Sequence, residues 1–422
     1  MRKQEIDPVR KGFRQFGLKD FSKIIPEAEM ESIGKRYGGD KRKRDLPFKV
    51  HFWLLVYFII EPTSRGLQGT INNAWCQIKE LLAVKGESLP LRKSSLSKKN
   101  KTRPVKAFEK VFEYLVKRCQ AARIPWKELE KFSAVRLVDS TLIDLALSLL
   151  AVFKTSRTDA PKKSQAKMQV DYELCGGFPR CIVLEAANSR NEKKVLKRLT
   201  KAKKSLFLID LGYWCYETFD EIISGGHYFI SRLKDNAVYR VVRKLGPHDY
   251  IIRLGGSKKM KHLVRLVGVR YGKEWYWYVT NLIDTKKFSG RKIAQIYRYR
   301  WQIEIFFLEL KEILKVRRLH SRTVNGLKLE LYAALCVYLL VKILMHQAAE
   351  KYNLKVEQIS FRKSYARIAI WLRGIFIRQE IPNAEEIEHV LDDLVLYCQA
   401  ERRTHKRRIV SICSQKKYRN IA

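Results

Sequence analysis

The chain has 422 residues, of which 85 are Lys or Arg and 43 are Asp or Glu, so its formal net charge is +42. Hydrophobic residues make up 46% and aromatic residues 11% of the chain, which is enough for a buried core and excludes a disordered basic tail. The length predicts about two to four domains. A positive excess of this size favours a polyanionic partner, and nucleic acid is the leading candidate.

The composition argues against a membrane protein. The longest apolar stretches, residues 52–60 and 331–341, fall short of the roughly 18–20 residues that a membrane-spanning helix needs. No apolar stretch follows the charged N-terminus, so we expect no secretory signal and a cytoplasmic location. The eight cysteines include no C-x-x-C pair, and we expect them to be reduced.

The first part of the chain has the periodicity of helices. Apolar residues recur at helical spacing in residues 21–33, 48–60 and 105–122, and the basic stretches 41–44 and 92–106 interrupt this pattern. Residues 1–128 are therefore predicted to form a helical, basic domain.

From residue 134 the pattern changes to strands bounded by Gly, Pro, Asn or Ser. Strands are predicted at 134–139, 168–174, 180–186, 205–210 and 227–233, with a helix at 216–223 before the last of them. This order predicts a mixed α/β sheet.

The rest of the chain divides into a β-rich piece and a long helical region. Residues 236–288 have the pattern of a β-rich insertion and residues 291–348 that of helices, so we place the core domain at 129–349. Residues 350–422 are predicted to form a helical region with a basic end, whose apolar periodicity suits a dimer interface.

The most informative segment is the predicted helix 291–315. At about 100° per residue, four of its polar side chains fall within about 60° of one another. They are Tyr297, Arg300, Glu304 and Lys311. An Arg and a Glu four residues apart are also an ordinary surface salt bridge. An acid flanked by cations is nevertheless what phosphodiester chemistry requires, because the acid can bind metal and the cations can bind phosphate.

Two aspartates upstream end apolar strands. Asp139 ends the strand at 134–139, and Asp210 ends the strand at 205–210 just before a Leu-Gly pair. Taken alone, each aspartate is explained by a cap or a turn. Together with Glu304 they form an ordered set of two strand-end acids and one helical acid, a combination that the other carboxylates of the core lack.

The spacing Tyr-x2-Arg-x3-Glu-x6-Lys resembles the Y-R-E-K signature of bacterial transposases of the insertion-sequence-4 family. That family also has two aspartates at strand ends upstream. The resemblance implies a DDE transposase with Asp139, Asp210 and Glu304 as its catalytic, metal-binding acids. It also implies a fold class: an α/β, ribonuclease-H-like mixed sheet with a β-rich insertion, flanked by helical N- and C-terminal regions.

Three carboxylates in one place form an oxygen-rich site that suits Mg²⁺, with Mn²⁺ as a substitute. Two such ions, about 3.5–4 Å apart, can activate the attacking oxygen and stabilise the leaving oxygen of a phosphodiester. The spacing alone predicts metal-assisted phosphoryl transfer. The resemblance adds cut-and-paste transposition: cleavage at the terminal inverted repeats of an insertion sequence and joining of the 3′ ends to target DNA.

The resemblance also implies contacts with DNA. Arg300 and Lys311 would hold backbone phosphates, and Tyr297 could donate a hydrogen bond to one. Arg232 matches a family position that faces the transposon end, although an Arg at that place can equally be a solvated residue of an edge strand.

An aromatic run at 275–278 adds a further candidate. Strand alternation places Trp275 and Trp277 on one face and Tyr276 and Tyr278 on the other, and we expect at least one pair in the core. In relatives that cut through a DNA hairpin, an aromatic residue in this region stacks on a flipped base. Tyr276 is the best match, but it stands where Trp is expected, so hairpin formation stays open.

The predicted partners are double-stranded DNA, at the element ends and at the target, and a second copy of the chain in a paired-end complex. The expected location is the bacterial cytoplasm, on the nucleoid when DNA is bound. Two alternatives stay open at this point. One is a domesticated, non-catalytic DNA-binding protein, and the other is a two-metal nuclease that cuts without joining strands.

Overall fold

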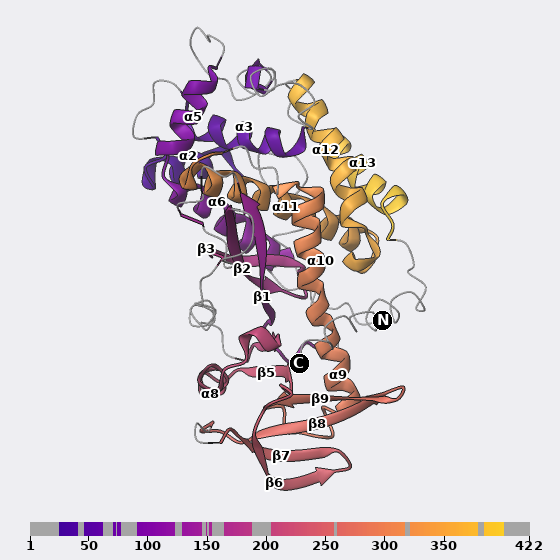
Figure 1. The fold of residues 1–422 in the computed structure, drawn as a ribbon. Helices are drawn as coiled ribbons and strands as arrows, with labels where there is room; N and C mark the ends of the chain where they lie inside the picture. The colour runs from indigo at the N-terminus through magenta and orange to yellow at the C-terminus, as the bar shows by residue number, and fades with distance from the viewer. Residues whose placement is uncertain are drawn as a thin grey trace.

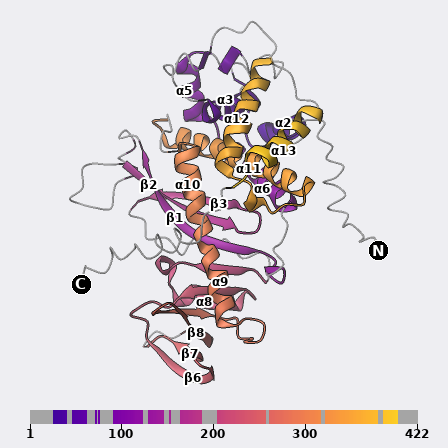
Figure 2. The same cartoon turned by 90° about the vertical axis from the view of Figure 1, so that its right-hand side faces the viewer.

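The computed structural model describes residues 25–40, 46–61, 71–72, 74–76, 91–122, 129–145, 149, 152–153, 164–187, 204–256, 260–316, 321–378 and 384–400. Figures 1 and 2 show a mixed α/β fold in which helices gather at one end of a long sheet. Within the described residues, no helix is both long and apolar enough to cross a membrane.

The sheet has nine strands in the order β3-β2-β1-β4-β5-β9-β8-β7-β6. The first five in the chain are β1 (Val135–Leu145), β2 (Ser164–Glu173), β3 (Phe178–Ala186), β4 (Leu206–Ile209) and β5 (Tyr228–Arg232). β1, β4 and β5 run parallel to one another, and β2 and β3 are antiparallel to their neighbours. These strands confirm the five predicted from the sequence, with shifted ends. The prediction that Asp139 ends its strand is wrong, because β1 continues to Leu145 through its pairing with β2. Asp139 lies instead where the pairing of β1 with β4 ends.

The remaining strands lie in the segment predicted to be β-rich. They are β6 (Tyr239–Gly246), β7 (Asp249–Leu254), β8 (Val264–Tyr271) and β9 (Glu274–Thr280). β9 pairs with β5, so these strands continue the same sheet. The sequence did not reveal β6 as a separate strand, because most of its residues are exposed and show no alternation.

The centre of the sheet explains the positions of the two aspartates. β4 is a run of four buried apolar residues between two parallel neighbours, as is usual for a strand covered on both faces. Val138 of β1 is in register with Ile209 of β4. Asp139 and Asp210 therefore follow paired residues at the same edge of the parallel strands.

A continuous helical run crosses the sheet. It begins with α9 (Gly290–Arg298), where the Ser289 side chain accepts a hydrogen bond from the Lys292 amide. A 3₁₀ turn (Tyr299–Trp301), α10 (Gln302–Leu308) and a π-helical turn (Glu309–Ile313) follow. Figures 1 and 2 show α9 beside the outer strands and α10 beside β1 and β2. The predicted helix at 291–315 is thus confirmed, with two local changes in its winding.

The other helices are α2 (Glu27–Arg36), α3 (Phe48–Ile60), α5 (Lys93–Thr102), α6 (Val105–Ala122), α8 (Tyr216–Ser224), α11 (Val324–Lys351), α12 (Phe361–Arg378) and α13 (Ala384–Tyr397). α11 is apolar on all sides and buried along most of its length, as expected for a central helix. It packs against α3, α5, α6, α12 and α13. One hydrophobic core therefore joins the N-terminal and C-terminal helices to the inner half of the sheet.

Candidate active site

The three predicted acids come from three different elements and face one another. Asp139 lies within β1, Asp210 directly follows β4, and Glu304 lies in α10. Local hydrogen bonds fix both aspartates: Asp139 Oδ1 accepts from the Ser140 amide at 2.7 Å, and Asp210 Oδ2 accepts from the Gly212 amide at 3.4 Å. The sequence prediction that they converge agrees with this geometry.

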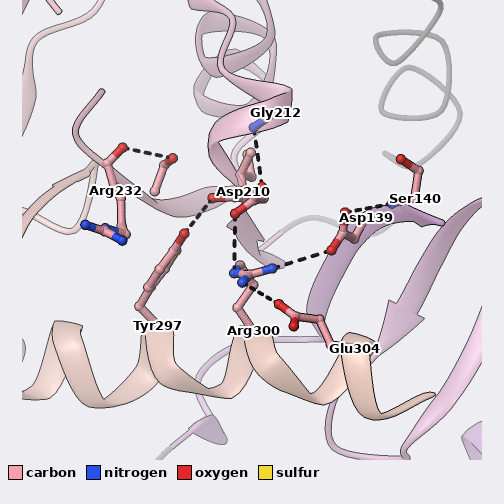
Figure 3. Close-up of polar contacts among 10 residues, drawn as sticks. Asp139, Ser140, Asp210, Gly212, Arg232, Tyr297, Arg300 and Glu304 are labelled. Carbon is pink, nitrogen blue, oxygen red and sulfur yellow. Dashed lines mark hydrogen bonds and ion pairs between the residues drawn. The ribbon is translucent and has the colours of Figure 1, made fainter. Parts of the chain in front are cut away.

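One guanidinium joins all three acids. Arg300 Nη1 lies 3.4 Å from Asp139 Oδ2, Nε lies 3.6 Å from Asp210 Oδ1, and Nη2 lies 2.7 Å from Glu304 Oε1. Figure 3 shows the guanidinium in the middle of the three carboxylates. The predicted i,i+4 pair of Arg300 and Glu304 is therefore part of a larger cluster than a surface salt bridge.

Burial shapes the electrostatics of this cluster. Burial raises the pKa of Asp139 to about 6, and the nearby acids add to the rise while Arg300 opposes it. Burial likewise raises the pKa of Glu304, against the effect of Arg300. Burial alone would lower the pKa of Arg300, but the neighbouring acids hold it above its ordinary value. Three acids thus share the single positive charge of Arg300, so these four side chains together are net negative when the acids are ionised.

The donor set fits a divalent metal by its chemistry. Carboxylate oxygens are the ligands that Mg²⁺ and Mn²⁺ prefer. In the described part of the chain, no three His, Cys, Asp or Glu side chains are already gathered around a metal position. Here the acid oxygens face the Arg300 guanidinium instead.

Tyr297 lies under the end of β4. The residue is 7% exposed, and its ring packs edge-on against Tyr278, with ring centroids 5.4 Å apart. The hydroxyl donates a hydrogen bond to the Ile209 carbonyl at 3.3 Å. Burial raises the pKa of Tyr297 to about 12. Its side chain therefore supports the backbone that carries Asp210.

Lys311 reaches the same strand as Asp139. It lies in the π-helical turn, and its ammonium donates a hydrogen bond to the hydroxyl of Thr141 on β1. Sequence reasoning did not identify Thr141 as a site residue. The available signal was its position two residues after Asp139, since residues i and i+2 of a strand share a face.

The two remaining predicted DNA contacts pair with each other. Arg232 is exposed at the end of β5, and its guanidinium lies 5.4 Å from the centre of the Tyr276 ring. The Tyr276 hydroxyl donates to Glu274 Oε2 at 3.0 Å. Figure 3 shows Arg232 on the Tyr297 side of the acid cluster.

The aromatic run divides between two faces, as predicted. Tyr278 is buried and packs on the side of α9, whereas Trp277 packs in the smaller core on the opposite side of the sheet. Trp277 covers Gly268, where a Cβ atom would come within 2.9 Å of the indole. The expectation of at least one core pair is met in part, because Tyr278 is buried and its facemate Tyr276 is only partly buried.

Other acids of the core have structural partners. Asp171 accepts two hydrogen bonds from Arg136 in a buried pair between β1 and β2. Glu309 is off the stripe of the helix and accepts a hydrogen bond from the Tyr338 hydroxyl at 3.0 Å. Both therefore hold elements together.

Among the basic stretches, 92–106 forms α5 and the start of α6. The stretch at 41–44 lies outside the described residues, as do two further Lys- and Arg-rich stretches of the sequence, 193–204 except Lys204 and 402–419.

The chain is similar to known transposases. Residues 130–340 match the family described as the transposase DDE domain. The chain is 26% identical over 287 residues to a probable transposase for insertion sequence element IS5377 of Geobacillus stearothermophilus, which covers 64% of this chain and 72% of that protein. It is 27% identical over 271 residues to a putative transposase for element IS4SA of Synechocystis, covering 63% and 74%.

A shorter match is 30% identical over 194 residues to the transposase InsG for element IS4 of Escherichia coli, covering 42% of this chain and 43% of that one. A solved piggyBac transposase synaptic complex with hairpin DNA aligns with 97% of this chain and 90% of that one, at 11% identity and a TM-score of 0.46. That score is too low to support an argument. The family match covers half of the chain, and the chain belongs to the DDE transposase family of enzymes that act on DNA.

Proposed function

We propose that the protein is the cut-and-paste transposase of an insertion element. It binds the terminal inverted repeats, hydrolyses phosphodiester bonds at the element ends and joins the freed 3′ ends to target DNA. The convergence of Asp139, Asp210 and Glu304 on the Arg300 guanidinium carries this proposal. The strand order β3-β2-β1-β4-β5, with β1, β4 and β5 parallel, supports assigning this half of the sheet to a ribonuclease-H-like core.

The acids are the proposed ligands of two Mg²⁺ ions, for which Mn²⁺ can substitute. When bound, the metal supplies activation of the attacking oxygen and stabilisation of the leaving oxygen. The protein holds the two aspartates through the Ser140 and Gly212 amides and presents Glu304 from a helix packed on β1. Attack by water leaves a free 3′ hydroxyl, and attack by that hydroxyl on a target phosphodiester joins the strands.

The helical stripe is proposed to serve as the Y-R-E-K signature. Arg300 and Lys311 bind backbone phosphates, and the Tyr297 hydroxyl orients the strand end before Asp210. Arg232 and Tyr276 face the transposon end as a cation and ring pair, which is suited to a phosphate next to an unstacked base. Tyr276 is the residue proposed to stack on a flipped base if a hairpin forms.

The regions around the core are proposed to complete the complex. Residues 1–128 bind the element ends, the strands at 236–288 extend the catalytic sheet, and residues 350–422 contribute to a homodimer in the paired-end complex. Lys and Arg side chains in these regions give a salt-dependent affinity for duplex DNA. The proposed location is the bacterial cytoplasm.

The test uses the purified full-length chain, Mg²⁺ and a duplex that carries the element's own ends. Each of three variants, D139N, D210N and E304Q, should lower the cleavage rate at least about a hundredfold. Mutation of residues that only hydrogen-bond to metal ligands already lowers metal affinity or activity about 10–100-fold. Binding of the duplex should change little. D144N is the matched control, because Asp144 lies on the same strand, is exposed and bonds Gln165.

The outcomes separate the candidate functions. Cleavage followed by strand joining supports the transposase, and cleavage without joining points to a nuclease. Wild-type activity in any of the three acid variants removes that residue from the site. Absence of cleavage by the wild-type protein under all metal conditions would contradict the proposal.

A further inference from the structure

The contact of Arg300 with the acid cluster has a chemical consequence of its own. Its three guanidinium nitrogens each face a different carboxylate: Nη1 faces Asp139, Nε faces Asp210, and Nη2 faces Glu304. An arginine side chain that contacts one acid forms an ordinary salt bridge. Arg300 contacts three acids, which come from β1, the end of β4 and α10, and its guanidinium therefore lies between them.

The contact lies in a partly desolvated place. The Arg300 side chain is 17% exposed, and the side chains of Asp139 and Glu304 are 19% and 31% exposed. Water screens such charges less than it screens surface pairs, so their attraction is stronger. The carboxylates therefore have a tightly held cation in the protein without DNA.

A divalent metal needs the same oxygens. The shortest contact, 2.7 Å between Arg300 Nη2 and Glu304 Oε1, is a charge-assisted hydrogen bond that a metal bound to this oxygen would have to replace. We infer that Arg300 is an internal counter-ion that competes with divalent metal for the three acids and keeps metal affinity low in the DNA-free protein. This inference rests on the proposed function, which makes the acids metal ligands.

Competition between Arg300 and metal sets the apparent metal affinity. If the acids are free of Arg300 in only a small fraction of molecules, the apparent metal affinity falls by that fraction. A displaced guanidinium would remain next to the site, where phosphate oxygens are its best partners. The same side chain would then be an obstacle to metal in one state and a phosphate ligand in the other.

A purely structural role predicts the opposite sign. If Arg300 only holds the acids together, its removal lets three negative side chains move apart, and metal affinity falls. If Arg300 competes with metal, its removal frees the acids, and metal affinity rises. The direction of the change therefore distinguishes the two roles without any measurement of catalysis.

The experiment measures Mn²⁺ binding to the full-length, DNA-free protein by electron paramagnetic resonance of the free ion. R300Q should bind Mn²⁺ at least about tenfold more tightly than wild type. D139N identifies the signal that belongs to this site, because that signal should be lost. R298Q is the control for charge, since Arg298 is an exposed residue of the same helical run and its replacement removes an equal charge. It should change the affinity less than about threefold.

Several results would overturn the inference. These are an R300Q affinity equal to or weaker than wild type, the absence of Mn²⁺ binding by R300Q, or an equal tightening in R298Q. R300K provides a second variant if R300Q does not fold, because one ammonium cannot serve three acids; it should tighten binding by a smaller factor, and an unchanged or weaker affinity overturns the inference. The proposed function is judged separately by cleavage and joining of the element ends.

Discussion

Thr141 is a residue of the site that the sequence pattern did not predict. It shares a face of β1 with Asp139 and accepts a hydrogen bond from the Lys311 ammonium. Without this hydroxyl, a flexible lysine side chain loses a fixed position beside the acids. T141V should therefore lower the single-turnover cleavage rate about tenfold, and T141S should stay near wild type. Equal rates for T141V and T141S would show that the hydroxyl does not position Lys311.

Tyr297 offers a test of what a signature residue contributes. Y297F removes one buried hydrogen bond to the Ile209 carbonyl, so we expect a loss of about 1 kcal/mol in the free energy of unfolding. Urea denaturation measures this loss. The affinity for duplex DNA at a fixed salt concentration should not change, whereas the loss of a direct hydrogen bond to a phosphate would weaken it. Weaker DNA binding with unchanged stability would mean that the hydroxyl faces the DNA.

The acids could be predicted from the sequence, and their common partner could not. The sequence pattern alone points to the three acids, because each one follows a strand pattern or lies on a helical stripe: Asp139, Asp210 and Glu304. The position of the Arg300 guanidinium depends on the side chains of three elements at once. Local spacing shows only its i,i+4 neighbour Glu304, which explains why a pairwise salt bridge was the alternative interpretation.

The joint between the outer strands and α9 depends on one buried arginine. Arg265 of β8 pairs with Asp249 of β7 and donates to the carbonyls of Leu282 and Phe288 at 3.0 and 2.7 Å. R265M would leave a largely buried acid and two carbonyls without this partner. We expect it to cost about 3–5 kcal/mol in the free energy of unfolding.

The matched control for that variant is R270M. Arg270 is on the same strand but exposed, and its Nε donates to the Gly272 carbonyl at 3.1 Å. Its replacement should change stability by less than about 0.5 kcal/mol. Equal losses for R265M and R270M in chemical denaturation would show that the buried contacts of Arg265 add nothing specific.

The helical run that carries the signature shows where periodicity arguments succeed. A uniform 100° per residue placed Lys311 on the stripe of Glu304. The structure has a tighter turn at Tyr299–Trp301 and a wider turn at Glu309–Ile313. Glu304 nevertheless pairs with Arg300, and Lys311 still reaches Thr141 on β1. π-helical turns often occur at functional sites. A hydrophobic pattern at 100° per residue does not locate them, because the widened turn at Glu309–Ile313 breaks the uniform spacing that the pattern assumes.

Across the whole molecule, the N-terminal helices and the catalytic sheet share one hydrophobic core. Phe108 of α6 is fully buried and packs against Phe48 and Phe52 of α3, with ring centroids 5.3 and 5.7 Å away. F108A should cost about 3–5 kcal/mol. Because the core is continuous, amide hydrogen exchange should accelerate in both α6 and β4. K117A, an exposed change on the same helix, should leave both unchanged. Faster exchange confined to α6 would show that the helices unfold independently.

The order of helices and strands along the chain could be predicted from the sequence, but the order of the strands within the sheet could not. Helices at 48–60 and 105–122 agree with α3 and α6 as predicted. The predicted helix at 21–33 corresponds to α2, which begins at Glu27, and its first residues lie outside the described part of the chain. Pairing of β9 with β5 joins residues such as Arg232 and Tyr278. Sequence periodicity has no information on such distant partners.

That pairing also determines which parts can move. A shift of the outer strands against β4 and β5 would break the backbone hydrogen bonds between β5 and β9 and disturb the Arg232 and Tyr276 pair. The backbone pairing of β1, β4, β5 and β9 therefore favours a fixed separation between the two aspartates and the Arg232 and Tyr276 pair. A duplex that reaches both places has to adapt its own shape to that separation, and an easily deformed end sequence would be the better substrate.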